Sequence, residues 1–108
     1  HSDLADATTT VASSATSTLN QFDKTVYRSV KLFISATDAT NSRFEIVEAN
    51  VTHDGTNAFI STFGSTTNYT GGLCVFSADI SGDNVRIRVT NISDASTVFK
   101  LQRIAMDI

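Results

Sequence analysis

The segment VKLFISA at residues 30–36 decides the fold, because its apolar residues recur at every second position. A period of two is the pattern of a β-strand that turns one face to a core and the other to water. Residues 85–89, VRIRV, repeat the pattern with Arg86 and Arg88 on the alternate face. The two segments therefore predict strands rather than helices.

Similar alternation extends along the chain, and short clusters of Gly, Asp, Asn, Ser and Thr separate the alternating stretches. The predicted strands span residues 26–37, 43–53, 57–64, 72–80, 85–91 and 97–106. Asp54-Gly55, between two of these strands, is a hairpin signal. Turn clusters at regular intervals are typical of sandwiches and barrels. We predict an all-β fold, an antiparallel, jelly-roll-like β-sandwich of about eight strands.

The length of 108 residues fits one domain. We expect residues 1–7 to form a flexible lead-in, in which His1-Ser2 resembles the remnant of a purification tag. Residues 8–108 are predicted to form a single sandwich domain. Within it, the Thr-rich residues 8–18 predict a weak edge strand or extended arm, followed by a short strand that reaches Phe22.

The chain carries few charges, and they are slightly negative in sum. Charged residues make up 18% of the sequence and the net charge is −3, whereas an average domain has roughly 25% charged residues. Because a nucleic-acid-binding domain needs a basic stripe, we expect no nucleic-acid partner. No apolar run approaches the roughly 18 residues that a membrane-spanning helix needs, so we expect no membrane insertion.

Cys74 is the only cysteine, so the chain can form neither an internal disulfide nor a cluster of thiolate metal ligands. Its neighbours Leu73, Val75 and Phe76 are apolar. This setting predicts a buried, inert thiol rather than a nucleophile. The sequence also has no glycine-rich phosphate-binding motif, so no cofactor is expected.

The acidic residues and the internal histidine do not form a catalytic or metal-binding pattern. Asp79 and Asp83 flank a turn, and we expect them to accept hydrogen bonds from local backbone N–H groups rather than to hold calcium. Glu45 and Glu48 lie three residues apart on a predicted strand and so point to opposite faces. Glu48 is the one expected to turn toward the core, where it would need a cationic partner. His53 is expected at an exposed hairpin tip, and no catalytic or metal-binding residue is predicted.

The candidate surface contacts are Tyr69, Arg86 and Arg88. Tyr69 lies in the polar stretch 65–71 and could stack on a sugar. Arg86 and Arg88 share one strand face and could hold an anionic sugar or a neighbouring subunit, or else pair with acids on an adjacent strand. The other aromatic candidates are Tyr27, Phe59 and Phe63. For these, packing in the core is the commoner outcome.

Three motifs follow one another along the chain. Residues 22–31 read F-x-x-x-x-Y-R-S-x-K, residues 48–58 read E-x-x-V-x-H-D-G-T-x-A, and residues 76–87 read F-x-A-D-I-S-G-x-x-V-R-I. Together they resemble a β-domain in virion structural proteins of tailed phages, especially marine phages that infect cyanobacteria. The resemblance covers residues 16–104.

The resemblance implies a non-enzymatic building block of a phage particle, located in the virion. Its partners would be other virion subunits, and by analogy with tail-fibre domains, which are commonly trimers, a homo-oligomer is expected. The leading hypothesis is a tail-fibre or appendage module that acts by self-association or surface adhesion. The alternatives are a carbohydrate-binding module for a host-surface glycan, a capsid-surface decoration domain and an enzyme, and no residue pattern favours the last.

Overall fold

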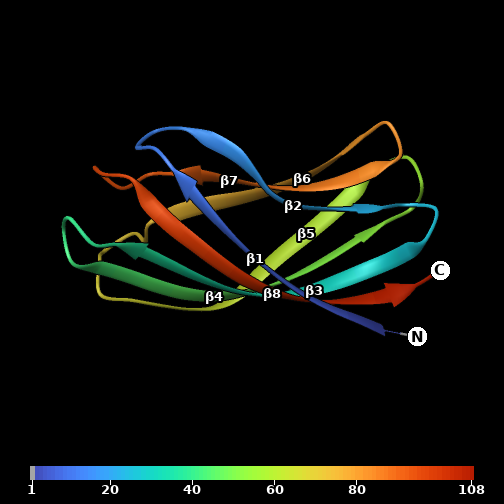
Figure 1. The fold of residues 1–108 in the computed structure, drawn as a ribbon, viewed down its shortest axis with the longest axis horizontal. Helices are drawn as coiled ribbons and strands as arrows, with labels where there is room; N and C mark the ends of the chain where they lie inside the picture. Colours follow the sequence, from blue (N-terminus) through green and yellow to red (C-terminus); the bar gives the residue numbers. More distant parts are fainter. Residues whose placement is uncertain (1) are drawn as a thin grey trace.

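The computed structural model describes residues 2–108, with side chains described from Ala5 onward, as two antiparallel sheets packed face to face (Figure 1). The strands are β1 (Ser2–Val11), β2 (Thr16–Asp23), β3 (Tyr27–Asp38), β4 (Arg43–His53), β5 (Ala58–Thr67), β6 (Cys74–Ser81), β7 (Asn84–Asn91) and β8 (Thr97–Asp107). The other described residues lie in turns and loops. Over residues 2–108 there is thus no helix, and no candidate for a helical membrane span.

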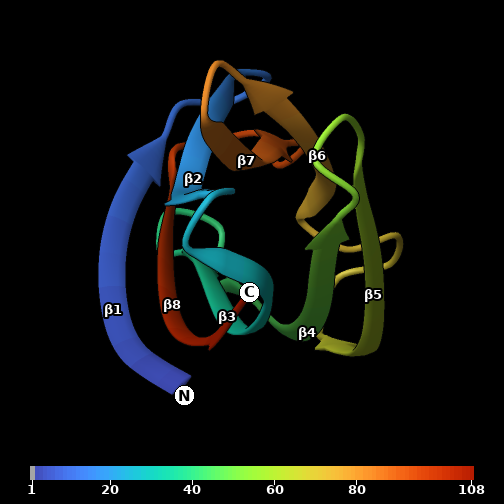
Figure 2. The same cartoon turned by 90° about the vertical axis from the view of Figure 1, so that its right-hand side faces the viewer.

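The larger sheet has five strands in the order β1-β8-β3-β4-β5, and the smaller has three in the order β2-β7-β6. Figure 2 shows the two sheets as curved layers, with β1 and β5 at the two sides of the larger one. β3, β4 and β5 follow one another as a meander, while the chain crosses between the sheets after β1, β2, β5 and β7. The antiparallel β-sandwich is therefore confirmed, and the jelly-roll subclass stays a prediction.

The core lies between the sheets and is filled by the inward residues that the alternation predicted for β3 and β7. They are Val30, Leu32, Ile34 and Ala36 on β3 and Val85, Ile87 and Val89 on β7, none more than 3% exposed. Full burial of one such aliphatic side chain stabilises the fold by about 1.5–3 kcal/mol. Because the inward phase of both strands is fixed in this way, their alternate residues must form the outer faces of the two sheets.

Several predicted boundaries differ from the structure, and two of these differences lie in the edge strands of the larger sheet. Ser2–Ala7, predicted as a lead-in, belong to β1 and pair with β8 without a register shift. Backbone hydrogen bonding does not require alternating apolar residues. This edge strand could therefore not be recognised from its polar sequence. β5 continues to Thr67, into the predicted loop, because its pairing with β4 resumes after a register shift opposite Ile46 and Glu48. His1, part of the expected tag remnant, lies outside the described residues.

Candidate functional site on the outer face of the large sheet

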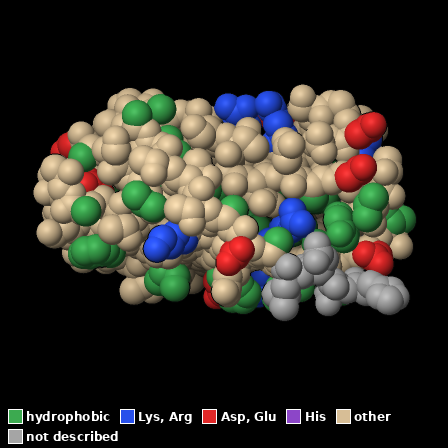
Figure 3. All heavy atoms as spheres, in the orientation of Figure 1, with side chains coloured by type: hydrophobic (Ala, Val, Ile, Leu, Met, Phe, Trp, Pro, Cys, Tyr) green, Lys and Arg blue, Asp and Glu red, His purple; other side chains and the backbone are tan. Residues whose placement is uncertain are grey.

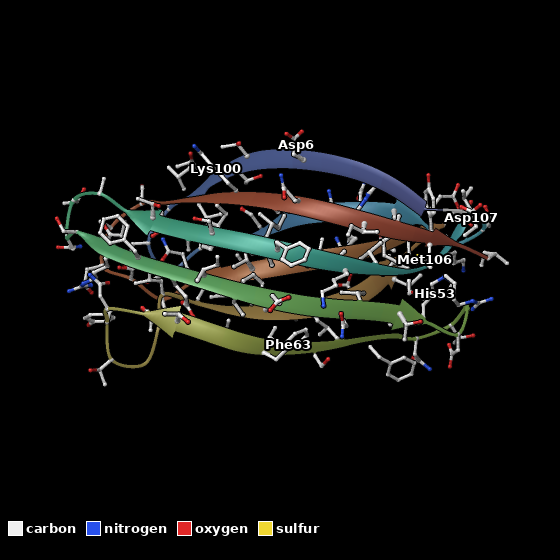
Figure 4. The ribbon with its side chains drawn as sticks, turned by 90° about the horizontal axis from the view of Figure 1, so that it is seen from below. Asp6, His53, Phe63, Lys100, Met106 and Asp107 are labelled. Atoms are coloured by element: carbon white, nitrogen blue, oxygen red, sulfur yellow. The ribbon has the colours of Figure 1, made fainter. Side chains whose placement is uncertain are left out.

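The outer face of the five-stranded sheet carries large apolar side chains that the sandwich core does not use. We call this surface the apolar face; it comprises Phe33, Phe44, Ile46, Phe59, Phe63 and Met106. Between 39% and 56% of each of these residues is exposed. Figure 4 looks onto this face and shows Phe63 on β5 and Met106 on β8, at opposite sides of β3 and β4.

The cross-strand register places these side chains on one surface. Phe33 of β3 lies opposite Glu48 of β4, which in turn lies opposite Phe63 of β5. Directly opposed residues point to the same side of a sheet. Phe44 and Ile46 alternate with Glu48 along β4 and therefore share that side.

A single basic side chain lies between two rings of the apolar face. The Lys31 Nζ atom is 5.0 Å from the Phe63 ring centroid and 5.7 Å from that of Phe33. The same Nζ lies 3.5 Å from a carboxylate oxygen of Glu48. The cation thus has two aromatic neighbours and a counter-ion, and the centre of the face is close to electrically neutral.

The face is hollowed where small residues lie between large ones. Across the sheet, Met106, Ser29, Thr52 and Phe59 form one row, from β8 to β5. The short side chains in the middle of this row leave a groove of about 500 Å³, which Lys31 also lines. A second hollow, of about 590 Å³, lies farther along the same face. Its outward lining residues include Asp6, Phe33, Ile46 and Lys100.

The outer face of the three-stranded sheet is polar instead, and it holds two of the predicted contact residues. Arg86 donates two hydrogen bonds to Asp79, at 2.7 and 2.6 Å. These bonds hold the pKa of the Asp79 carboxyl below its usual range and raise the pKa of Arg86. Arg88 lies on the same face and has no hydrogen-bond partner among the described side chains. Figure 3 shows Lys and Arg side chains gathered over this smaller sheet.

The pairing of Arg86 with an acid across neighbouring strands confirms one of the two alternatives stated for it. For Asp79 the prediction was wrong, because its carboxylate binds the Arg86 guanidinium and not the backbone of the turn. Local backbone bonding of this kind occurs at Asp54, whose carboxylate accepts the N–H groups of Thr56 and Asn57. These two bonds lower the pKa of the Asp54 carboxyl.

Tyr69, the third predicted contact residue, lies in the loop between β5 and β6. The Arg43 guanidinium stacks over its ring, with 3.8 Å from Cζ to the ring centroid. Arg43 also forms an ion pair with Asp94 at 3.3 Å. One face of the Tyr69 ring is therefore occupied by a cation, and the structure does not join Tyr69 to the arginines on the smaller sheet.

The inward acid of β4 is Glu45, not Glu48 as predicted. Val47, Ala49 and Val51 fix the inward phase of this strand, so Glu45 falls on the inner side and is 8% exposed. Its carboxylate accepts hydrogen bonds from the Leu73 N–H at 2.7 Å and the Ser65 hydroxyl at 2.6 Å. A buried carboxylate is thereby satisfied without a cation.

His53 was predicted to be exposed, but it is 4% exposed. It is the last inward residue of β4, and its ring lies 6.0 Å from that of Phe22 between centroids. The Nδ1 atom accepts the Gly55 N–H at 3.0 Å, so Nε2 carries the proton that is donated to the Tyr27 carbonyl at 2.8 Å. Nδ1 thus bonds the hairpin turn and Nε2 the start of β3, so both nitrogens are used in structural hydrogen bonds.

Cys74 is partly buried and packs against the core, in agreement with the predicted inert thiol. Burial, and secondly the Glu45 carboxylate 3.6 Å away, raise the pKa of the Cys74 thiol. Within residues 5–108, no three His, Cys, Asp or Glu side chains lie close enough together to hold a metal ion.

The sequence interpretation missed the apolar face, although one residue signalled it. Phe33 lies between the inward Leu32 and Ile34 and so must point outward. Phe59 and Phe63, for which core packing was expected, lie on the outer surface. Their side is set by the register with β4, which the local sequence does not reveal.

No protein-family model matches the sequence, and no curated protein is significantly similar to it. Among solved structures, the tailspike protein of Acinetobacter phage vB_ApiP_P1 matches 97% of this chain with 18% identity and a TM-score of 0.51. The chain spans 22% of that protein. At this level of identity the likeness shows the fold alone.

Two further tailspikes match with a TM-score of 0.44 and add nothing to the argument. One, from Acinetobacter baumannii phage AM24, matches 96% of this chain with 10% identity, over 26% of its own length. The other, gp49 of Acinetobacter baumannii bacteriophage Fri1, a capsular polysaccharide depolymerase, matches 95% with 15% identity, over 17% of its own length. The resemblance to the marine cyanobacterial-phage type stays a prediction.

Proposed function

We propose that this chain is a non-enzymatic interaction domain of a tail-associated protein in a tailed-phage particle. It acts by self-association or surface adhesion, and the apolar face of the large sheet is its working surface. The observation that carries the proposal is the set of six large apolar side chains exposed together on that face.

The outer face of the large sheet differs from the face that an antiparallel sheet ordinarily presents to water. A solvated outer face is ordinarily polar, with apolar residues confined to the inner face. Here Phe33, Ile46 and Phe63 occupy outward positions on three adjacent strands. Large apolar side chains exposed among polar residues on one face are typical of interaction surfaces.

The fold supports the particle context. A domain of similar fold forms part of the tailspike of an Acinetobacter phage. The motifs at residues 22–31, 48–58 and 76–87 resemble a phage virion domain independently of that comparison. A shared fold is compatible with many functions, so the site and the motifs together, rather than the fold, carry the assignment.

The state of the acids and of the thiol favours a binding role over catalysis. The Asp79 carboxylate is occupied by Arg86, and the Asp54 carboxylate by backbone N–H groups. Glu45 is buried beneath a loop, and Cys74 is kept protonated. A general acid or base must reach the proton that it transfers, and these groups are committed to structural bonds.

The test is whether the chain is built into particles. Purified particles of the phage that encodes it should contain the chain by mass spectrometry, and antibodies against the domain should label the tail in immunogold micrographs. Detection in infected cells but never in purified particles would contradict the proposal. Labelling of the capsid alone would favour the decoration-domain alternative.

A second candidate is a carbohydrate-binding module, which the groove beside Phe59 favours. The groove combines an exposed ring with the polar side chains of Asn50, Thr52 and Ser61, and ligand sites are commonly concave, apolar and supplied with a few polar groups. Binding to a glycan array that Phe59→Ala abolishes and Val75→Ala leaves intact would support it. An array without any hits would exclude it for the glycans displayed.

A further inference from the structure

We propose that the occupant of the apolar face is a second copy of this chain, packed sheet against sheet. The inference rests on the proposed function, because it takes the apolar face as the interaction surface, and it names the partner. Three properties of the face support a self-complementary contact: its area, the arrangement of its charges and the contrast with the opposite sheet.

The area suits a stable dimer. Strands of a sheet lie about 4.8 Å apart and rise about 3.3 Å per residue, so five strands of about ten residues present roughly 800 Å². A standard protein–protein interface buries about 800 Å² on each partner. The apolar face spans at least four of these strands, from Met106 on β8 to Phe59 on β5.

The charges at the centre of the face are arranged for a two-fold contact. Lys31 lies on β3, the middle strand of the sheet, and Glu48 lies on the neighbouring β4. A two-fold axis that lies in the interface plane, midway between Lys31 and Glu48 and perpendicular to the line joining them, brings Lys31 of each copy opposite Glu48 of the other. In such an isologous interface the same patch serves both copies. Lys31 of each copy then keeps a counter-ion on burial, so the central cations are not desolvated without a partner.

The smaller sheet lacks these properties. Its outer face is mainly polar, and the charged residues of its strands are Arg86 and Arg88 with the acids Asp79 and Asp23. Arg86 is already paired with Asp79 within one chain. Val75 is the one large apolar side chain that is mostly exposed on that face, at 58%. It therefore provides a matched control position.

The first experiment compares arginine substitutions on the two sheets. The wild-type chain should show twice its 11.6 kDa mass by light scattering or sedimentation equilibrium at about 1 to 100 µM. Ile46→Arg and Phe63→Arg should each weaken the dimer by at least about tenfold, while Val75→Arg should not. Circular dichroism should show that all three variants keep the sheet fold.

The second experiment uses the central charges. Lys31→Glu alone places four acids at the centre of its dimer, and Glu48→Lys alone places four lysines there, so each variant should be largely monomeric. An equimolar mixture should form a heterodimer, because residue 31 of each copy then meets a residue 48 of opposite charge. If the Lys31–Glu48 ion pair acted only within one chain, the mixture would not form a heterodimer.

A wild-type chain that stays monomeric throughout this range overturns the inference, as does a Val75→Arg variant that dissociates as readily as Ile46→Arg. A monomeric wild-type chain that binds glycans, and loses this binding in Ile46→Arg, would also overturn the dimer inference. It would still support an adhesion function of the apolar face. Absence of the chain from particles, by contrast, would contradict the proposed function without bearing on the dimer.

Discussion

The Glu45 carboxylate accepts the backbone N–H of Leu73 at 2.7 Å and so ties the start of β4 to the loop that leads into β6. Its second oxygen accepts the Ser65 hydroxyl at 2.6 Å. Leu73 is itself fully buried, so one carboxylate fixes the place where the chain leaves the large sheet and enters the small one.

Removal of this carboxylate should destabilise the domain. In Glu45→Ala the buried Leu73 N–H loses its partner, and an unsatisfied buried donor costs about 1–3 kcal/mol. Glu48→Ala, which removes a partly exposed ion pair from the same strand, should cost less than about 1 kcal/mol. Urea unfolding followed by circular dichroism measures both. If both variants lost the same free energy of unfolding, the loop would not depend on Glu45.

Gly72 should tolerate substitution less well than its neighbour Gly71. Both have positive φ, 77° and 89°, so either alanine is strained; left-handed backbone costs a residue with a Cβ about 1–2 kcal/mol. A Cβ on Gly72 would also lie 3.0 Å from a Glu45 carboxylate oxygen, whereas one on Gly71 meets nothing within 4 Å. The melting temperature of Gly72→Ala should therefore fall below that of Gly71→Ala. The reverse order would contradict this account of the loop.

The Asp79–Arg86 pair should stabilise the domain at neutral pH and lose its effect in acid. Because Arg86 lowers the pKa of Asp79 in the folded state, the contribution is fully present above the unfolded-state pKa of about 3.9. It is lost as the pH falls through the lower folded-state pKa.

The pair is partly solvent-exposed, so Asp79→Asn should cost at most about 1 kcal/mol at pH 7. The difference from wild type should shrink steadily as the pH falls from about 5 to 2. Asp83→Asn, an exposed acid in the same hairpin, serves as the control. Unfolding curves across this pH range measure the effect. A difference in unfolding free energy between wild type and Asp79→Asn that grows as the pH falls would contradict the prediction.

Cys74 should resist thiol reagents while the domain is folded. Burial and the Glu45 carboxylate raise the pKa of its thiol, and the thiolate is the reactive form. At pH 8 the reaction with a disulfide reagent should be at least about a hundredfold slower than that of a free thiol, since each pKa unit removes about tenfold of the thiolate. Unfolding in urea should restore the ordinary rate. Rapid labelling of the native protein would show that the region around β6 opens.

The sequence predicted the strands well because the inward residues of β3 and β7 form unbroken apolar series. It failed where two apolar series compete. On β4, Phe44 and Ile46 lie on one face, and Val47, Ala49 and Val51 lie on the other. The longer apolar series faces the core. That outcome turned Glu45 inward and also buried His53, two positions for which the prediction was wrong.

The apolar face was harder to predict because it belongs to no single strand. Phe59 and Phe63 reach it through the register with β4, and Met106 through the register with β3. The local sequence of these strands does not determine either register. Tyr69, Arg86 and Arg88 were selected for their residue types and local positions, and the structure gives Tyr69 and Arg86 partners within the same chain.

The two edges of the large sheet differ in a way that bears on aggregation. β1 pairs with β8 in unbroken register over all ten residues, so its free edge is regular. β5 is interrupted opposite Ile46 and Glu48, and Gly64 there adopts a φ of 67°. Such interruptions twist an edge and discourage further strands from pairing with it. Extension of this sheet by an added strand is thus favoured at the β1 edge over the β5 edge, which disfavours growth of a continuous fibre.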